Sequence, residues 1–214
     1  MIDDIAASGM EMNDMYAAVV HDVKNQLAEL SLLLNARGDA QQELGIALNA
    51  ARRLTELLLL QRQDSDMLEI NVDLVDPTDT LQLLVAEYCD LFPQVALQVD
   101  VSEAPQLGFF DHALVRLALA NAVHNACRHA RSAVRLAARR QGQMLLFEIA
   151  DDGPGFPPAM LSDNGKLPAR ASLNGTGMGL YLARKIAGLH TLEGQQGCIE
   201  LANDGGAVFR MILP

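Results

Sequence analysis

Apolar residues recur at helical spacing over two long segments near the start of the chain. Ala, Val and Leu return every three or four positions from about residue 10 to 36, and again from about 41 to 63. This spacing is typical of amphipathic helices. Between the two segments, Asn35 to Asp39 has the composition of a turn, with Gly38 as a helix C-cap. The pattern therefore predicts an antiparallel helical hairpin.

The apolar stripe of the second predicted helix is wider than one neighbouring helix can cover. The run Leu57–Leu60 places leucine on several sides of that helix. A lone hairpin buries little apolar surface, so we expect a homodimer in which two hairpins form a four-helix bundle. Docking of a monomeric hairpin against the rest of the chain is the alternative.

Beyond residues 64–69, which have the character of a linker, the pattern changes to short strands mixed with helices. Residues 157–174 are rich in Pro, Gly, Ser and Asn and predict a mobile loop. This order of elements predicts a two-layer α/β sandwich with a mixed sheet. The whole chain is thus predicted as α+β, with a helical hairpin domain over 1–66 and the sandwich over 67–214. The expected strands are 70–74, 95–101, 133–139, 144–150, 198–202 and 207–213, and the expected helices are 77–91, 111–130 and 178–189.

Composition narrows the class of protein. Of the 214 residues, 50% are hydrophobic and none is Trp, which indicates a core of Leu, Ala, Val and Ile. The formal net charge of −11 argues against a nucleic-acid-binding surface. Three widely spaced cysteines lack metal-ligand spacing and favour reduced, buried thiols. No signal peptide is evident, and no apolar run approaches the roughly 20 residues that span a bilayer. We therefore expect a cytoplasmic protein without direct membrane insertion.

Two motifs in the sandwich segment carry polar side chains suited to a nucleotide site. Asn121 and Asn125 lie one helical turn apart, so their amides face the same side and suit a metal ion among phosphates. Asp151 follows an apolar strand and precedes a flexible turn with Gly153 and Gly155. Each motif by itself has an ordinary alternative, which is the polar end of an amphipathic helix or a tight turn.

A third motif is a glycine-rich loop that runs into a helix. It extends from Gly175 to Leu180 and reads Gly-Thr-Gly-Met-Gly-Leu. The free N–H groups and the positive dipole end of such a helix favour phosphate. Each of the three motifs supplies a different part of a nucleotide site. Together, in this order along the chain, they predict such a site.

The three motifs resemble the ATP-binding domain of sensor histidine kinases, part of the wider GHKL family that includes gyrase, Hsp90 and MutL. The resemblance implies the Bergerat fold and an ATP site with Mg²⁺. It also implies that Asn125 ligates the magnesium, that Asn121 lies beside it, and that Asp151 accepts the exocyclic amine of adenine. His129 stands where the family often has Tyr. The other residues expected at the nucleotide are Arg128, His129, Gly153, Gly155, Gly175, Thr176, Gly177, Gly179 and Leu180.

A kinase of this kind needs a phosphorylatable histidine upstream, and the segment from Val19 to Leu27 resembles the family's histidine box. A ring nitrogen of His21 is a good nucleophile near neutral pH, and Asp22 is placed to accept a proton or hold the tautomer. Asn25, one turn further along, is implied to orient water when the partner is dephosphorylated. A lone histidine on a helix is more often structural, but the neighbouring residues and the downstream ATP motifs favour the functional interpretation. The implied partner is the receiver domain of a response regulator.

Three features depart from the family pattern. Gln26 replaces a proline that often occurs in the histidine box, and no phenylalanine box is recognisable between the glycine motifs. The loop from Thr191 to Gly197 is longer than the family's usual pair of glycines. The family's sensor segment is also missing, so we expect either a separate sensor partner or a shortened chain.

Two other functions remain alternatives to the kinase. One is a non-catalytic phosphotransfer or scaffold protein with a degenerate kinase fold. The other is a gyrase-, Hsp90- or MutL-like ATPase in which ATP drives dimer gating. Phosphoryl transfer in cis and transfer across the dimer are both compatible with the sequence.

Overall fold

The chain divides into two compact units, Met1–Glu69 and Ile70–Pro214. The computed structural model describes residues 70–161 and 177–214 continuously. In the N-terminal unit it describes residues 20, 22, 23, 25–34, 36, 37, 40, 43, 45–47, 50, 51 and 53–55.

The described residues of the N-terminal unit are almost all helical. Residues 25–34 form an uninterrupted helical run, within which the Ser31 hydroxyl donates a hydrogen bond to the carbonyl of Leu27 (2.7 Å). Leu32 and Leu33 are 72% and 61% exposed, so a single chain leaves part of this apolar surface uncovered. Gly38 of the predicted turn lies outside the described residues, and the hairpin and its dimer stay predictions.

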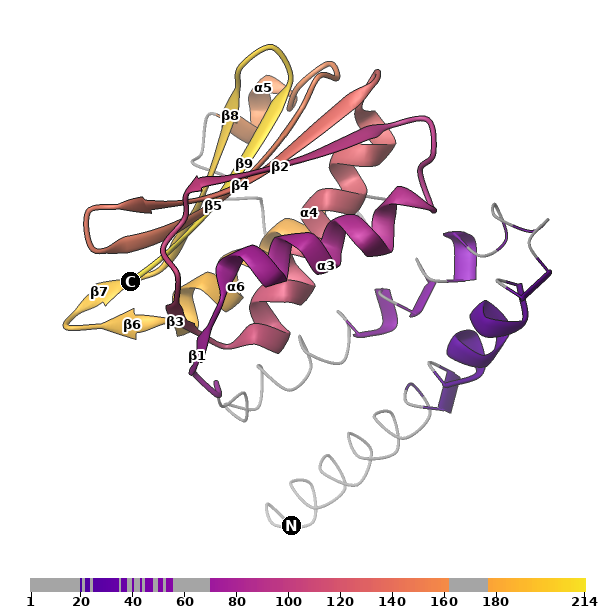
Figure 1. Ribbon diagram of the computed structural model, residues 1–214, viewed down its shortest axis with the longest axis horizontal. Coiled ribbons are helices and arrows are strands. Elements are labelled where there is room, and N and C mark those ends of the chain that lie inside the picture. Colours follow the sequence, from indigo (N-terminus) through magenta and orange to yellow (C-terminus); the bar gives the residue numbers. More distant parts are fainter. Residues whose placement is uncertain are drawn as a thin grey trace, which may run out of the picture. The chain divides into compact units, whose positions relative to one another are not determined.

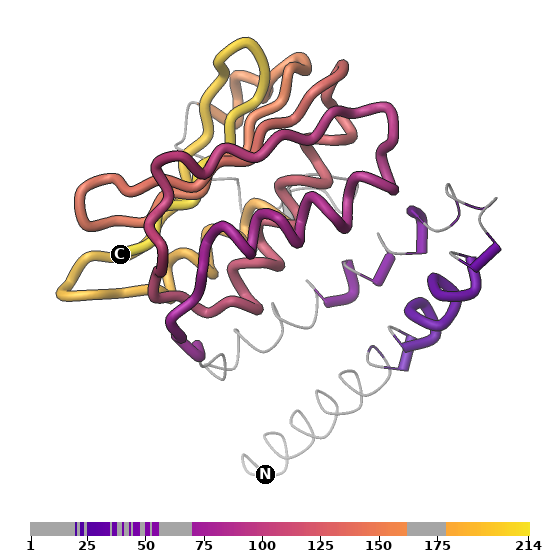
Figure 2. The backbone as a smooth tube through the Cα atoms, viewed as in Figure 1, coloured from indigo at the N-terminus to yellow at the C-terminus, as the bar shows by residue number. Residues whose placement is uncertain are grey.

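The second unit is built on a mixed five-stranded sheet with the strand order β2-β4-β5-β9-β8 (Figure 1). β2 pairs with β4 in parallel, and the other three pairings are antiparallel. The last two strands, yellow in Figure 2, form a hairpin that places β9 beside β5. The strands are β2 (Ala96–Glu103), β4 (Ala133–Gln141), β5 (Met144–Asp151), β8 (Cys198–Asn203) and β9 (Ala207–Leu213).

Three helices cover one face of this sheet, α3 (Pro77–Cys89), α4 (His112–His129) and α6 (Gly177–Leu189) (Figure 1). Leu84, Leu119 and Ile186, one from each helix, are completely buried. They form a core with the alternate residues of the strands that face the helices. The predicted two-layer sandwich is therefore confirmed for this unit.

The opposite face of the sheet carries a buried carboxylate among three arginines. Glu148 on β5 accepts hydrogen bonds from Arg135 (2.8 Å), Arg139 (2.6 Å) and Arg210 (2.8 Å). Burial raises the pKa of Glu148, but the Arg210 hydrogen bond and the charges of the three guanidinium groups outweigh this effect and lower the pKa below its usual value. The carboxylate therefore stays ionised and joins three neighbouring strands.

Several short elements were not predicted from the sequence. β1 (Asp73–Val75) overlaps the strand expected over 70–74, but its partner β3 (Gly108–Phe110) was not expected, and α5 (Pro158–Leu161) occupies the start of the segment expected to be a loop. Residues 162–176, the rest of that segment, lie outside the described residues. Elements of two to four residues are too short to show a hydrophobic period, so only their tertiary partners define them.

The long loop after His190 forms a hairpin of β6 (Thr191–Leu192) and β7 (Gln195–Gln196). Its two turn residues, Glu193 and Gly194, have φ angles of 50° and 82°. These angles match the tight turns that join antiparallel strands. The residues that make this loop longer than the family pattern thus form a short two-stranded hairpin.

Two further expectations concern the cysteines and membranes. Cys127 is buried as predicted, but Cys89 and Cys198 are exposed, because each lies on an outward-facing position of its helix or strand. None of the helices in the described part of the chain has the length and apolar character needed to cross a bilayer.

Candidate functional site

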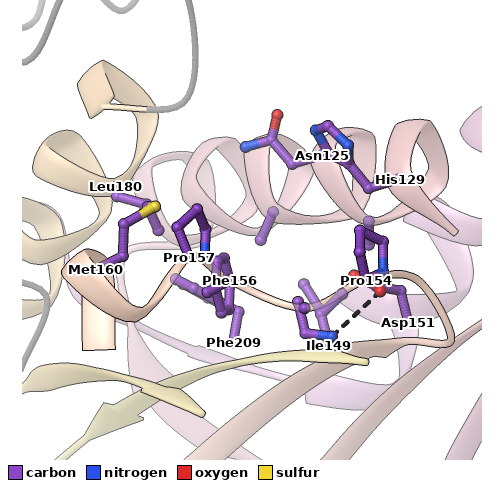
Figure 3. A pocket seen from close by; sticks show the side chains of 14 residues that line it. Asn125, His129, Ile149, Asp151, Pro154, Phe156, Pro157, Met160, Leu180 and Phe209 are labelled. Carbon is purple, nitrogen blue, oxygen red and sulfur yellow. Dashed lines mark hydrogen bonds between the residues drawn. The ribbon is translucent and has the colours of Figure 1, made fainter. Parts of the chain in front are cut away.

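A cavity of about 290 Å³ lies between α4, the sheet and the turn that follows β5 (Figure 3). Its walls are mainly apolar, with Ile149 and Phe209 from the sheet among them. Three polar side chains also line it, those of Asn125, His129 and Asp151. An apolar chamber with a few polar groups suits a flat ring that carries hydrogen-bonding groups on its edge.

The polar and apolar residues are distributed along the length of the cavity. Asn125 and His129 project from α4, Leu180 and Met160 lie at one end, and Asp151 lies at the other (Figure 3). Leu180 belongs to the first turns of α6, which begins at Gly177. A helix start at the end opposite the carboxylate gives the cavity one end suited to a hydrogen-bond donor and one suited to an anion.

The backbone holds the Asp151 carboxylate in one orientation. Its Oδ1 accepts hydrogen bonds from the N–H of Gly153 (2.8 Å) and of Ala207 (3.2 Å), the second of which is the dashed line in Figure 3. The side chain is only 9% exposed, and among the described residues no further hydrogen bond involves it. Oδ2 is therefore the oxygen left to accept a donor from a ligand.

The glycines of this turn are needed mainly by the protein itself. A Cβ atom at Gly153 would overlap the carbonyl of His129, at the end of α4, and one at Gly206 would overlap the carbonyl of Asp151. Gly155 has a φ angle of 81°, as a glycine turn requires. The end of α4 therefore fills the space in which a side chain at residue 153 would lie.

Asn203 is a site residue that the sequence pattern did not reveal. Its side-chain oxygen accepts from the N–H of Phe156 (2.8 Å), and its side-chain nitrogen donates to the carbonyl of Phe156 (3.0 Å). Phe156 lines the cavity, so this amide at the end of β8 sets the position of one wall. The only local signal is an Asn before Asp-Gly-Gly, which normally indicates a turn and nothing more.

Asp152, the residue after Asp151, makes several hydrogen bonds to the segment that follows α4. Its carboxylate accepts from the N–H groups of Arg131 (2.7 Å) and Ser132 (3.0 Å) and from the Ser132 hydroxyl (2.6 Å). The hydroxyl and amide of Ser132 hold the pKa of Asp152 well below its usual range. Asp152 therefore connects the turn after β5 to the segment that follows α4 by hydrogen bonds.

Comparison with known proteins identifies this arrangement. Residues 110–214 match the family described as histidine kinase-, DNA gyrase B- and HSP90-like ATPase. The chain is 27% identical to sensor protein kinase PilS of Pseudomonas aeruginosa, over 91% of this chain and 39% of that protein. It is 29% identical to sensor protein SphS of Synechococcus elongatus, over 95% of this chain and 55% of that protein. Residues 110–214 therefore belong to this ATPase family, and the chain as a whole is similar to sensor histidine kinases.

A solved structure agrees with this assignment. The ATP binding domain of PrrB from Mycobacterium tuberculosis is 29% identical, with a TM-score of 0.53, over 67% of this chain and 97% of that domain. The chain spans 39% of PilS and 55% of SphS, so it corresponds to part of each relative.

The structure separates the two amides predicted for the nucleotide site. Asn125 lies at the cavity, whereas Asn121 is 2% exposed and packs against α6, where a Cβ atom at Gly179 would lie 3.5 Å from its Cγ. Arg128 is exposed and does not line the cavity. Position at the cavity therefore favours nucleotide contact by Asn125 and His129 over contact by Asn121 and Arg128.

Other residues predicted for the site are only partly described. Gly175 and Thr176 lie outside the described residues, as does His21. Asp22 and Asn25 are helical and exposed to solvent. Their proposed roles in phosphoryl transfer rest on the resemblance of the histidine box.

Asn125, the residue that the resemblance implies as a magnesium ligand, lies at the cavity. Among the described residues, no three His, Cys, Asp or Glu side chains gather where they could hold a metal ion. The amide oxygen of Asn125 is a suitable hard ligand for Mg²⁺, which commonly binds through few protein groups together with substrate phosphates. The residues present thus fit a metal that enters with a nucleotide.

Proposed function

We propose that this chain is a histidine protein kinase core that binds ATP in the cavity and phosphorylates itself on His21. One observation carries the proposal: the Asp151 carboxylate, fixed through Oδ1 by two backbone N–H groups, lies at one end of an apolar cavity and leaves Oδ2 for a ligand. The exocyclic amine of adenine is a donor that fits this acceptor. Similarity to sensor histidine kinases supports the kinase reaction at the level of the family.

The shape of the cavity supports one orientation of ATP. With adenine at Asp151, its ring lies against the apolar walls, and the triphosphate extends towards Asn125 and the start of α6. The N–H groups at that helix start and its dipole favour phosphate. Asn125 would supply an oxygen to Mg²⁺, which when bound neutralises phosphate charge.

The proposed reaction is an in-line phosphoryl transfer. A ring nitrogen of His21 donates its lone pair to the γ-phosphorus, and the bond from that phosphorus to the β–γ bridging oxygen breaks, so that ADP leaves with the electron pair. The proton on the other ring nitrogen is then more acidic, and Asp22 is placed to accept it or hold it. The phosphoryl group passes next to an aspartate of a response-regulator receiver domain.

The N-terminal unit completes the proposal. Its exposed leucines, such as Leu32, support a homodimer in which two hairpins pair and present His21 to an ATP site of the same or the partner chain. Asn25 would orient water to remove the phosphoryl group from the regulator, which makes the same unit its phosphatase. A separate sensor protein is the proposed source of the signal.

The test combines labelling and binding on the full chain. We expect γ-labelled ATP with Mg²⁺ to give an acid-labile, base-stable label on the wild type and on His112→Ala, a control histidine at the start of α4. His21→Ala should bind ATP as the wild type does but take no label. Asp151→Asn, which replaces the acceptor Oδ2 by a donor, should lose ATP binding in calorimetry.

Other outcomes would reject the proposal in distinct ways. A label that persists in His21→Ala would exclude His21 as the acceptor. ATP hydrolysis without any label would indicate a gating ATPase. A wild type that binds no ATP would indicate a phosphotransfer or scaffold protein that retains the fold alone.

A further inference from the structure

Asp111 joins three parts of the second unit through separate hydrogen bonds. The residue is 7% exposed and is the N-cap of α4, where its Oδ1 accepts from the N–H of Leu114 (2.9 Å). Its Oδ2 accepts from the N–H of Asn71 (2.9 Å), the second residue of the unit. Its own backbone N–H donates to Nε2 of His190 (3.0 Å). An N-cap needs only the first of these bonds.

His190 extends this set of bonds to α6. The ring is 2% exposed, and because Nε2 accepts from Asp111, the proton of the neutral ring is on Nδ1. Nδ1 lies 2.8 Å from the carbonyl of Ile186, in the last turn of α6, and donates to it. The start of α4 and the end of α6 are therefore held together through one imidazole.

The segment by which the chain enters the unit has few other attachments. In β1, Leu74 is 54% exposed, and its cross-strand partner Phe109 in β3 is 66% exposed. Val72 is also 44% exposed. Phe110 buries one end of β3, but β1 itself exposes its apolar side chains, so the position of β1 depends on its short ladder with β3 and on the bond between Asn71 and Asp111.

The same two helices line the cavity at other points along their length. Asn125 and His129 lie near the far end of α4, and Leu180 lies near the start of α6. A helix of 18 residues is a rigid element of about 27 Å. Displacement of α4 or α6 at the cavity is therefore transmitted to the end where Asp111 and His190 meet.

We propose that Asp111 is a positioning residue that couples the segment around Asn71 to the nucleotide-binding cavity through α4 and α6. Movement of the entering chain, as a signal from the N-terminal unit would produce, then changes nucleotide affinity. By reciprocity, a bound nucleotide stabilises the bond between Asn71 and Asp111. This inference rests on the proposed function only for the identity of the ligand.

The experiment measures amide hydrogen exchange at Asn71 by NMR in the full chain, with and without a non-hydrolysable ATP analogue and Mg²⁺. In the wild type, we expect saturating ligand to slow this exchange by at least about tenfold, because openings that weaken binding become rarer. Calorimetry on the same samples reports whether the ligand binds.

Asp111→Asn separates the two roles of the carboxylate. The amide keeps one oxygen to cap Leu114 but replaces Oδ2 by a nitrogen that cannot accept from Asn71. We expect the Leu114 amide to stay protected while Asn71 exchanges fast and no longer responds to the ligand. The matched control is Asp76→Asn at the N-cap of α3, where the side chain accepts from Thr78 (2.7 Å) and from no other residue that the structure describes. In this control, exchange at Asn71 should equal that of the wild type. Faster exchange in Asp111→Asn then results from the lost bond to Asn71 and not from altered capping.

A ligand-free comparison keeps this inference distinct from the proposed function. His190→Phe removes the acceptor of the Asp111 N–H, and we expect faster exchange at Asn71 while amides of β5 remain protected. If calorimetry shows no nucleotide binding, the proposed function fails, and this comparison alone decides the coupling. The coupling is overturned if Asn71 exchange is the same in His190→Phe, or if bound ligand leaves the wild-type exchange unchanged.

Discussion

The side-chain amide of Asn203 pairs with both peptide groups of Phe156, accepting from its N–H at 2.8 Å and donating to its carbonyl at 3.0 Å. The two residues are 47 positions apart in the chain, one at the end of β8 and one in the turn after β5. The pairing imitates one step of a β-ladder. Asn203 thus holds Phe156, which lines the cavity, although Asn203 itself does not line it.

Loss of this pairing should weaken nucleotide binding. Two exposed hydrogen bonds are together worth about 1 kcal/mol, so Asn203→Ala is expected to raise the Kd for ATP by roughly fivefold. Calorimetry checks the change, with Asp204→Ala as the control at the next residue. An affinity equal to that of the wild type would show that Phe156 keeps its position without Asn203.

A methyl group at Gly206 should destabilise the second unit. Its Cβ would overlap the backbone carbonyl of Asp151, which cannot move without disturbing β5. We expect Gly206→Ala to reduce the free energy of unfolding by about 1–3 kcal/mol. Gly188→Ala is the matched control, because its Cβ would meet only Gln196 at an ordinary 3.5 Å. Urea unfolding of both variants measures the difference, and equal stability would contradict the predicted overlap.

The low pKa of Asp152 predicts a stability effect that depends on pH. Hydrogen bonds from Ser132 lower the pKa in the folded state, so the ionised carboxylate stabilises the fold above the unfolded pKa of about 3.9. The difference in unfolding free energy between wild type and Asp152→Asn should be constant from about pH 5 to 7. It should shrink as the pH falls below about 4, as the carboxylate becomes protonated. Urea unfolding across this range measures it, and a difference that stays the same down to about pH 3 would contradict the stabilising role of the ionised carboxylate.

The cluster around Glu148 should affect stability and leave the cavity unchanged. Glu148→Gln leaves three guanidinium groups without their shared carboxylate, on the sheet face opposite the helices. Because the arginines are 34–44% exposed, we expect a loss of about 1–3 kcal/mol, less than for a fully buried pair. Urea unfolding measures this loss, and calorimetry should give an unchanged Kd for ATP. Glu200→Gln, at an exposed position opposite Arg210, is the control. A large change in ATP affinity would contradict the separation of the two faces.

The sequence alone determined the long elements of the second unit and the order of its motifs. The apolar period over 111–130 predicted α4, which runs from His112 to His129 with Asp111 as its cap. Alternation on both sides of Gly142 predicted the β4–β5 hairpin, in which that glycine has a φ angle of 64°. These signals are strong because each element contains many residues whose burial alternates with a regular period, so one exceptional residue does not obscure the pattern.

Only the tertiary structure decided which single polar residues act together. Asp152 contacts Ser132, Asn203 contacts Phe156, and Asp111 contacts both Asn71 and His190. Each pair is separated by 20 to 79 positions, and the sequence around each residue is also that of an ordinary turn or helix cap. A hydrogen bond needs its two atoms within about 3 Å, and this distance is set by how strands pair and helices pack, not by any local period. The elements could therefore be predicted from the chain, whereas the bonds that shape the cavity became visible only in the folded unit.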